Sequence, residues 1–397
     1  MRILHLCNKV PFPGRDGSSL AMASLLRCLS LGGNHIHCLA LNTQKHNVQK
    51  GEVPPSLAAT ITLHAIDANT TPTLGGALIN LFSKESYMTS RFYVQRYADV
   101  LQNLLRKKSF DVIIMDGFTQ AIYWPILHAL FSGPIVYRAH NIEHLVWERA
   151  IQQPMGLFRR WYLTIQNQRL RRFEEEISQQ AHAIWTITET DAAWFIHRKK
   201  PHSSLISVPC TASHWPGPPT AVSSGIFHLG ALDWWPNTEG LRWFFESVWP
   251  LVQTMNPTLS VQILSRSSPL EWIKRRDGVL FVSAEGGYEE ATTPWGISII
   301  PLHSGSGMRI KALEAMVYGK VMVSTALGVE GLGLTTGVHY LEANSPEDFA
   351  NALCTLSADA PLRLSLAQNA YRHAQLHFSD ETISLRLQQE LKQWVHE

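Results

Sequence analysis

The sequence has few of the features that would by themselves assign a protein class. Its 397 residues include five scattered cysteines, without CxxC spacing: Cys7, Cys28, Cys38, Cys210 and Cys354. Neither a disulfide framework nor a zinc site is therefore predicted, and a reducing cytosol suits this composition. The formal net charge is only +2, so the chain lacks the basic excess of a nucleic-acid-binding protein and we expect no nucleic-acid partner.

Long apolar runs are also missing. No stretch approaches the roughly 20 apolar residues that a membrane-spanning helix needs. The N-terminus begins directly with the strand-like residues 2–7, so we expect no secretory leader and a cytoplasmic protein. No Gly-x-Gly-x-x-Gly follows this first strand, which disfavours a dinucleotide-dependent dehydrogenase. No acidic Asp-x-Asp pair stands in a suitable loop, and we expect neither a metal nor another cofactor.

Apolar runs that alternate with helical patterns extend through the chain and predict an α/β protein. A length of 397 residues suits two domains of about 200 residues each. We expect an N-terminal domain over residues 1–209, a proline-rich linker over 210–224, a C-terminal domain over 225–378 and a last helix over 379–397. Each domain is predicted to be a doubly wound, Rossmann-like sheet.

The same pattern predicts the individual elements. Strands are expected at 2–7, 35–41, 60–66, 111–115, 134–138, 183–188, 225–230, 258–264, 278–282, 296–301 and 321–324. Helices are expected at 18–31, 76–107, 121–131, 156–180, 190–197, 241–255, 346–358, 361–378 and 381–394. Ser18 is expected to cap the first of these helices.

A glycine-containing loop between the last two predicted strands carries the most informative chemistry. Gly305 and Gly307 allow the backbone to come close to a ligand. The helix that begins near Arg309 offers unpaired N–H groups and a partial positive charge, which attract an anion. Arg309 and Lys311 add two full charges where the helix dipole alone would favour acids. Glu314, one turn further on, can accept hydrogen bonds from hydroxyl groups, so a diphosphate and a ribose are the predicted ligands.

The run from Gly305 to Leu332, Gly-Ser-Gly-Met-Arg-Ile-Lys-Ala-Leu-Glu and onward, resembles the donor-binding signature of family 4 glycosyltransferases. This resemblance implies the GT-B fold, with two Rossmann-like domains facing a cleft and a C-terminal helix that crosses back to the N-terminal domain. It also implies retaining, metal-independent transfer from a nucleotide-sugar donor. The expected acceptor is a glycan or a lipid-linked sugar in cell-surface polysaccharide or lipopolysaccharide biosynthesis. An ordinary Rossmann-type crossover with a solvated Arg/Lys pair remains the alternative.

The resemblance assigns roles to particular residues. Arg309 and Lys311 would stabilise the departing diphosphate, and Glu314 would contact the ribose. The donor would also contact a group of substrate-binding residues: Asn237, Gly305, Ser306, Gly307, Met308 and Glu330. A simple turn is the alternative for Glu330.

Two departures from the family pattern affect these roles. Family members usually carry two glutamates eight positions apart, but Ser306 stands eight positions before Glu314. The segment 230–240 resembles the Gly-x-x-x-x-x-Pro-Asn-x-x-Gly opening of one branch, without the arginine and lysine that usually follow this strand. We therefore expect Arg309 and Lys311 to supply the charge for the phosphates.

The N-terminal half contains a second constellation, Arg138-Ala-His-Asn-Ile-Glu-His144. His140 follows a predicted strand, and residues at the carboxyl ends of parallel strands line the ligand crevice of such sheets. The resemblance places His140, Asn141 and Glu143 near the sugar and its leaving phosphate, with His140 as a catalytic residue. A loop histidine without a function is the alternative. No third ligand joins His140 and His144, so a metal site is not expected.

Two further features have two interpretations each. Gly17 ends a loop rich in proline and glycine, where it is either a close-approach glycine near the sugar or acceptor or simply the start of a helix. The helix over 156–180 is basic and aromatic in its first part. Residues 156–173 could rest on an anionic membrane surface or form a solvated face.

Two other functions remain open. A nucleotide-sugar epimerase with the same fold would convert the sugar without an acceptor. A nucleotide-binding protein that has lost transfer would fit the serine at position 306.

Overall fold

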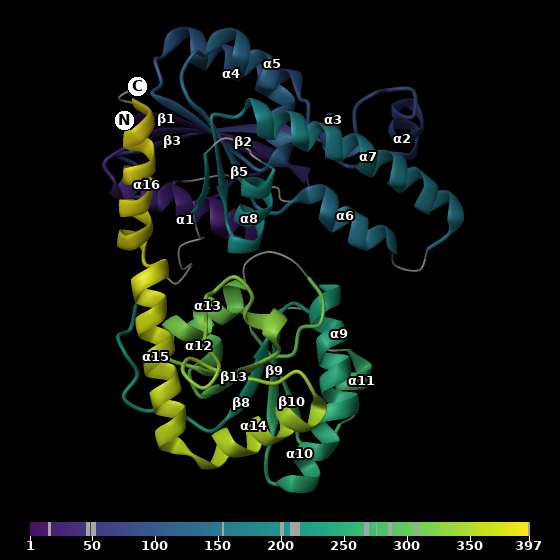
Figure 1. Ribbon diagram of the computed structural model, residues 1–397, viewed down its shortest axis with the longest axis vertical. Helices are drawn as coiled ribbons and strands as arrows, with labels where there is room; N and C mark the ends of the chain where they lie inside the picture. The colour runs from purple at the N-terminus through teal and green to yellow at the C-terminus, as the bar shows by residue number, and fades with distance from the viewer. Residues whose placement is uncertain are drawn as a thin grey trace. The chain divides into compact units, whose positions relative to one another are not determined.

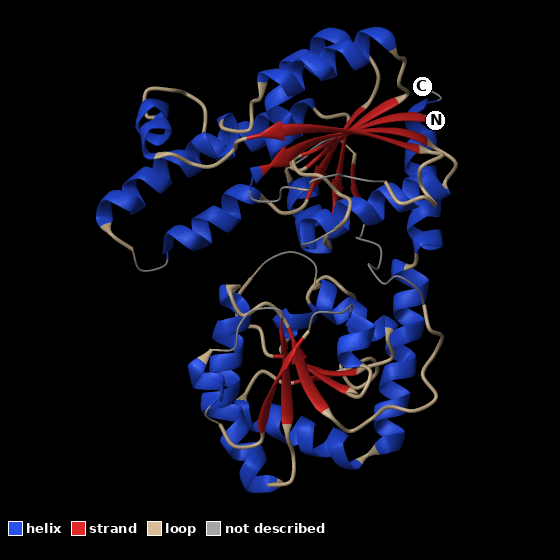
Figure 2. Cartoon of the chain, turned by 180° about the vertical axis from the view of Figure 1, so that it is seen from behind, coloured by secondary structure: helices blue, strands red, loops and turns tan. Residues whose placement is uncertain are grey.

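The computed structural model describes residues 1–14, 17–44, 48, 53–152, 155–198, 202–206, 215–265, 270–274, 276–284, 288–305 and 309–395. The chain divides into two compact units, each built around one parallel sheet (Figure 1). Unit 1 comprises Met1–Pro209 together with Asp380–Glu397, and unit 2 comprises Cys210–Ser379. Helices lie on both sides of each sheet (Figure 2). The predicted α/β class with two doubly wound sheets is confirmed.

Unit 1 contains a seven-stranded sheet in the order β3-β2-β1-β4-β5-β6-β7, and its pairings are parallel. The strands are β1 (Arg2–Cys7), β2 (His35–Thr43), β3 (Ile61–Ala68), β4 (Val112–Asp116), β5 (Ile135–Ala139), β6 (Ala183–Thr186) and β7 (Ser203–Leu205). The α-helices are α1 (Gly17–Leu31), α2 (Leu74–Asn80), α3 (Tyr87–Ser90), α4 (Gln95–Lys107), α5 (Trp124–Leu130), α6 (Glu143–Gln152), α7 (Leu157–Gln180), α8 (Glu189–His197) and α16 (Asp380–Val395). A 3-10 helix (Phe118–Tyr123) precedes α5.

The core of unit 1 forms two layers, one on each face of the sheet. One layer joins α1 and α16 to strand residues such as Ile3 and Cys7, and the other joins α4 to Leu4 and Leu6. The central strands β4 and β5 are buried at all five of their positions. Continuous burial is expected of parallel strands that are covered on both faces.

The last helix of the chain, α16, packs within unit 1. Arg27 on α1 donates a hydrogen bond of 2.8 Å from Nη2 to Asp380 Oδ1. The rings of Trp185 on β6 and Trp394 on α16 lie 5.9 Å apart between centroids. Residues far apart in the sequence therefore complete one core.

Unit 2 contains a six-stranded sheet in the order β10-β9-β8-β11-β12-β13, also with parallel pairings. The strands are β8 (Ile226–Leu229), β9 (Val261–Ser265), β10 (Val279–Ser283), β11 (Ile297–Ile300), β12 (Val321–Ser324) and β13 (Leu341–Glu342). The helices are α9 (Trp235–Trp243), α10 (Trp249–Met255), α11 (Glu271–Lys274), α12 (Tyr288–Thr292), α13 (Ile310–Val317), α14 (Pro346–Ala358) and α15 (Ala360–Phe378). A π-helical turn (Phe244–Val248) joins α9 to α10, and a 3-10 helix (Ala326–Val329) follows β12.

The prediction of one helical region over 76–107 is wrong. The structure has three separate helices here, because polar contacts interrupt the helical pattern after α2. Asn80 Nδ2 donates to the carbonyl oxygen of Glu85 at 3.2 Å. Ser86 then caps α3 by accepting a hydrogen bond of 3.3 Å from the amide of Met88.

Two of the predicted helices begin at other residues than expected. Helix α5 begins at Trp124, after the 3-10 helix, rather than at residue 121, and α9 begins at Trp235 rather than at residue 241. Pro125 lies in the first turn of α5 and Pro236 in the first turn of α9. Proline is tolerated there because the first amides of a helix have no intrahelical partner. These two prolines thus mark helix starts. None of the described helices is long and apolar enough to cross a membrane.

The close approach of α9 to the loop after β11 depends on Gly240. A Cβ atom at Gly240 would lie 2.1 Å from the carbonyl oxygen of Pro301. We expect Gly240→Ala to lower the free energy of unfolding by about 1–3 kcal/mol, because the backbone must shift. Chemical denaturation measures this loss. Gly75→Ala in α2 is the control, since a Cβ there meets nothing within 4 Å; an equal loss in both variants would contradict this explanation.

Candidate functional site

The first part of the candidate site is the loop between β11 and α13 in unit 2. Gly305 adopts a φ of +113°, which side chains other than glycine rarely tolerate. Its backbone lies beside the ring of Trp234, since a Cβ at this position would be 3.5 Å from the indole. The next three predicted residues, Ser306, Gly307 and Met308, lie outside the described residues.

Arg309 forms the N-cap of α13 and is almost fully buried. Its Nε donates to the carbonyl oxygen of Leu327 at 2.9 Å, and its Nη2 donates to the carbonyl oxygen of Gly305 at 3.2 Å. The exposed Glu330 carboxylate lies 3.6 Å from the same Nη2. The guanidinium therefore links the loop before α13 to the loop after β12, with one carboxylate beside it.

Lys311 is the second residue of α13 and points toward α9. Its Nζ donates a hydrogen bond of 2.6 Å to Asn237 Oδ1. The side chain of Asn237 is fixed in turn, because its Nδ2 donates to the carbonyl oxygen of Ala231 at 2.9 Å. Burial and the nearby charge of Arg309 lower the pKa of Lys311 to about 7. The ammonium is thus in a region with too little negative charge to keep its ordinary pKa.

Two further side chains, neither of them positively charged, lie close to these cations. Glu314, on the next turn of α13, is half-buried. Its charge partly offsets the lowering of the Lys311 pKa by burial and Arg309. His228 on β8 is fully buried, and its Nδ1 lies 3.1 Å from the carbonyl oxygen of Ile299. Burial and the charge of Lys311 lower the pKa of His228 well below its ordinary value, so this imidazole is neutral and adds no charge.

The second part of the candidate site lies at the carboxyl edge of the sheet in unit 1. Asp116, the last residue of β4, is fully buried and interacts with three side chains. Its Oδ2 lies 2.9 Å from His5 Nε2 and accepts a hydrogen bond of 3.0 Å from Arg138 Nη1, and its Oδ1 contacts His140 Nε2. The parallel pairing creates this cluster, because Asp116 and Arg138 are register partners on β4 and β5.

The electrostatics of this cluster differ from those of the loop in unit 2. Burial alone would raise the pKa of the Asp116 carboxyl, but Arg138 and His140 outweigh it and hold the pKa well below its ordinary value. The carboxylate is therefore charged and fixes the His140 ring through Nε2. Only 16% of the His140 side chain is exposed. Its Nδ1 is the nitrogen that remains for a ligand, because Nε2 donates to the carboxylate.

Glu143 and His144 lie beside a second buried carboxylate. Glu174 on α7 accepts from the amides of Glu143 and His144 at 3.0 and 3.3 Å, and its Oε2 lies 2.5 Å from His144 Nδ1. It thereby satisfies the first amides of α6. Burial and the charge of Glu174 raise the pKa of Glu143 to about 7. Asn141 Nδ2 lies 3.5 Å from Glu143 Oε1.

Gly17 is the first residue of α1 and is exposed. The prediction that Ser18 caps this helix is wrong, because Ser18 lies within it. Residues 15 and 16, which precede Gly17, are outside the described residues.

The structure thus groups the predicted residues in three places. Asn237 contacts Lys311; Gly305 and Glu330 flank Arg309; Asn141 and Glu143 follow His140 at the start of α6. The first two places are in unit 2 and the third is in unit 1.

Sequence reasoning missed Asp116 and Glu174. Asp116 ends the continuously apolar run 112–115, and the rule that drew attention to His140 applies to it equally. No local pattern indicated Glu174, which lies 30 or more residues from its partners.

One group of possible metal ligands occurs among the described residues. His5, Cys7 and Cys38 have ligand atoms that all lie within 4.8 Å of one another. Burial and the neighbouring Cys38 raise the pKa of the Cys7 thiol well above its usual range. Metals bind the thiolate, so this buried group is a poor metal site.

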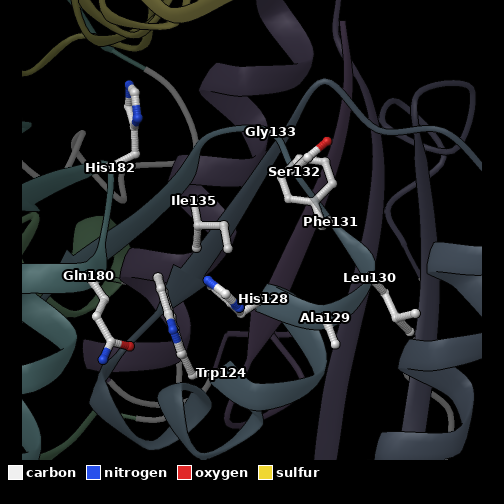
Figure 3. Close-up of a pocket in the computed structure, with 10 residues that line it drawn as sticks. All are labelled: Trp124, His128, Ala129, Leu130, Phe131, Ser132, Gly133, Ile135, Gln180 and His182. Carbon is white, nitrogen blue, oxygen red and sulfur yellow. The ribbon is translucent and has the colours of Figure 1, made fainter.

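A cavity of about 720 Å³ lies elsewhere in unit 1 (Figure 3). It is lined by residues that include Trp124, His128, Gly133 and His182. Gly133 precedes β5 and His182 precedes β6, so the cavity lies at the amino ends of these strands. It contains none of the predicted site residues and is remote from the carboxyl edge that carries Asp116 and His140.

We expect Asp116→Asn to destabilise the protein strongly, since the buried guanidinium of Arg138 would lose its countercharge. Removing one partner of a buried ion pair costs about 3–5 kcal/mol. Urea denaturation at pH 7 measures this cost. His140→Ala is the matched variant, since its side chain is partly exposed and should cost less. Similar stability of Asp116→Asn and the wild-type protein would show that the carboxylate does not hold the cluster together.

Comparison with known proteins relates these observations to a family. Residues 223–359 match the family model of glycosyl transferases group 1, which covers much of unit 2 and includes the Arg309–Lys311 region. The chain is 26% identical over 168 residues to an uncharacterized 44.6 kDa protein in the cps region of Klebsiella pneumoniae. That match covers 40% of this chain and 43% of the Klebsiella protein.

Solved structures resemble the chain over its whole length. Sucrose-phosphate synthase from Thermosynechococcus elongatus has a TM-score of 0.68 at 16% identity, with 99% of each chain covered. Alr3699/HepE from Anabaena, in complex with UDP and glucose, has a TM-score of 0.65 at 14% identity, again with 99% of each chain covered. The chain therefore has the GT-B fold, and its second unit carries a match to glycosyl transferases group 1.

Proposed function

We propose that the protein is a retaining glycosyltransferase of family 4 that moves a sugar from a nucleotide-sugar donor to a glycan or lipid-linked acceptor. The observation that carries this proposal is the cation pair Arg309 and Lys311 at the start of α13. Burial and the neighbouring charge of Arg309 lower the pKa of Lys311 to about 7, so a negative charge beside this ammonium would stabilise it. A diphosphate supplies that charge, and a helix N-terminus also favours it.

The residues of unit 2 have complementary roles in this proposal. Arg309 and Lys311 stabilise the charge that develops on the diphosphate as the glycosidic bond breaks. Glu314 accepts hydrogen bonds from the ribose hydroxyls. Asn237 holds the Lys311 ammonium through its 2.6 Å hydrogen bond. These cations make a divalent metal unnecessary, so transfer should continue in the presence of a chelator.

Relatives support the donor and the biological setting. HepE was solved with UDP-glucose as well as with UDP and glucose, and a UDP-sugar is the first donor class to test. The Klebsiella relative is encoded in a cps region, which supports a role in cell-surface polysaccharide or lipopolysaccharide biosynthesis.

The alternatives of an epimerase and of a binding protein without transfer predict different products. Incubation with a UDP-sugar and no acceptor would yield an epimerised UDP-sugar from an epimerase. A binding protein would return the donor unchanged, even with acceptors present. Transfer to an acceptor supports the proposal over both.

We expect Glu314→Ala to weaken nucleoside diphosphate binding by roughly 10- to 100-fold, because a charged hydrogen bond contributes about 1.5–3 kcal/mol. Calorimetric titration of UDP, GDP, ADP and dTDP measures the affinity and identifies the base. Glu347→Ala is the control, since Glu347 lies in the first turn of α14 in the same unit. If no nucleotide binds, or if Glu314→Ala binds as tightly as wild type, the donor site is elsewhere.

We also propose that unit 1 contacts the inner face of the cytoplasmic membrane through residues 156–173. The first turns of α7 expose Leu157, Phe158 and Trp161, with exposed fractions of 83%, 71% and 51%. Residues 155–172 include five arginines and no acidic residue. Exposed apolar side chains beside cations suit an anionic lipid surface.

Helix α2 supports the same membrane contact. It exposes Leu74, Ile79 and the following Phe82, while its polar Asn80 is buried. Arg169 on α7 holds this segment, because its Nη1 donates to the Asn80 carbonyl oxygen at 2.8 Å. The two helices lie side by side (Figures 1 and 2), and α2 adds apolar surface to that of α7.

Removing both Arg159 and Arg160 should weaken binding to anionic vesicles by roughly 30-fold, at about 1 kcal/mol for each cation near the surface. Co-sedimentation of Arg159→Gln/Arg160→Gln with phosphatidylglycerol vesicles measures the loss, and zwitterionic vesicles should bind neither protein well. Arg386→Gln on α16 is a control for a general loss of charge. Equal vesicle binding by wild type and the double variant would contradict membrane contact through this surface.

A further inference from the structure

A second cavity in unit 1, of about 400 Å³, lies at the carboxyl ends of β1, β2 and β3. Asn8 follows β1, Thr43 ends β2, and Thr70 and Thr71 follow β3. This is the sheet edge at which parallel α/β proteins bind ligands. It is also the edge that carries Asp116 and His140, on the adjoining strands β4 and β5. The volume falls in the usual range for small-molecule sites.

The lining of this cavity combines cations with hydroxyl groups. It consists of Asn8, Lys9, Thr43, Thr70, Thr71, Pro72, Arg91 and Phe92, and it includes no acidic residue. Arg91 is half-buried; its Nη1 donates to the carbonyl oxygen of Thr70 at 3.0 Å, and its guanidinium lies 4.9 Å from the Phe92 ring centroid. These contacts hold the charge of Arg91 at the wall of the cavity.

Two buried oxygen atoms at this cavity lack hydrogen-bond partners. Thr43 is 4% exposed and its Oγ1 has no hydrogen-bond partner. Asn8 is half-buried as a residue, but its Oδ1 atom is buried and also has no partner. An unsatisfied buried polar atom costs free energy, and such atoms call for a partner that binds there. Asn8 Oδ1 can only accept, whereas a threonine hydroxyl can donate or accept. Hydroxyl groups of a sugar satisfy both.

We infer that this cavity binds an acceptor sugar that carries a negatively charged group. Asn8 and Thr43 hydrogen-bond the sugar hydroxyls, Phe92 contacts the apolar face of the ring, and Arg91 with Lys9 binds a phosphate or carboxylate. This inference rests on the proposed glycosyl transfer, because it names the acceptor class of that reaction. The charged group can belong to an acidic sugar, to a sugar phosphate or to a lipid diphosphate.

The geometry also gives the acceptor a direction. Asn8 lies beside Gly117, since a Cβ there would be 3.8 Å from Asn8 Nδ2. Gly117 follows Asp116, which contacts His140. Adjacent strands are about 4.8 Å apart, so an acceptor in the cavity reaches along the sheet edge toward His140 within the length of one or two sugar rings.

Calorimetry on the full chain, without nucleotide, tests the inference. The probes are glucose, glucuronate, glucose 1-phosphate, inorganic phosphate and a short-chain prenyl diphosphate. We expect at least one charged sugar or the prenyl diphosphate to bind ten or more times as tightly as glucose, and the tightest probe identifies the source of the charge. Binding of inorganic phosphate as tight as that of every larger probe would indicate an adventitious ion only and would overturn the inference.

Two variants separate charge from hydroxyl recognition. Arg91→Gln should abolish the preference for the charged probe over glucose, whereas Thr43→Val should weaken both by a similar factor. Arg96→Gln, an exposed cation on α4, is the control and should leave binding unchanged. An undiminished preference in Arg91→Gln, with its thermal unfolding unchanged, would contradict the inference.

UDP binding is measured in the same samples. If the wild-type protein does not bind UDP, that result would count against the proposed donor site but not against this cavity. Retained UDP binding with no binding of any sugar or prenyl probe would count against the cavity alone.

Discussion

The arrangement of unit 2 depends on one electrostatic constraint, the placement of two cations at the N-terminus of a helix. Arg309 and Lys311 repel each other and the positive end of α13. Burial and the charge of Arg309 lower the pKa of Lys311 to about 7. Asn237 compensates only in part, because an amide oxygen carries no full charge. The backbone around this site is built to hold it: Gly240 brings α9 against the loop after β11, and Gly305 adopts a conformation that brings its carbonyl to Arg309. The diphosphate that we propose as ligand would reduce this charge repulsion.

Unit 1 is also built on a parallel sheet, but the buried charge at its sheet edge is paired within the protein. There the buried carboxylate of Asp116 has positively charged or hydrogen-donating partners within the protein, so its charge is balanced before any ligand arrives. The paired Asp116 carboxylate contacts His140 and orients its ring, whereas the two cations of unit 2 suit the anionic donor that we propose.

The sequence predicted most of the fold, because short continuous apolar runs in an α/β pattern leave few alternatives. The helix over 346–358 is confirmed at both ends, and the central strands lie within two residues of their predicted limits. The single helix over 76–107 was wrong, since its interruptions depend on contacts such as that between Asn80 and Gln166, 86 residues apart. Helices α5 and α9 also start at residues that differ from the prediction, with a proline in the first turn of each. Local patterns cannot reveal either effect.

The candidate site was predictable in composition but not in its contacts. The residue types at 305–314 indicated an anion site, yet nothing local paired Lys311 with Asn237, 74 residues away. Likewise His140 was singled out by its place after a strand, whereas its partner Asp116 and the more distant His5 meet only when β1, β4 and β5 pair. Hydrogen bonds between strand ends depend on the order of the strands in the sheet, and no single segment of the sequence determines that order.

The most direct test of the central claim is the proton uptake that accompanies UDP binding. If Lys311 has a pKa near 7 in the free protein and the diphosphate raises it, then binding takes up protons above pH 7 and affinity falls as pH rises. Titration in buffers of different ionisation enthalpy should give about 0.9 proton per UDP at pH 8, where the terminal phosphate of UDP, with a second pKa of about 6, is already ionised. Lys311→Met should show almost none at pH 8. Equal uptake in wild type and Lys311→Met, or none in either, would contradict the claim that an anion neutralises this lysine.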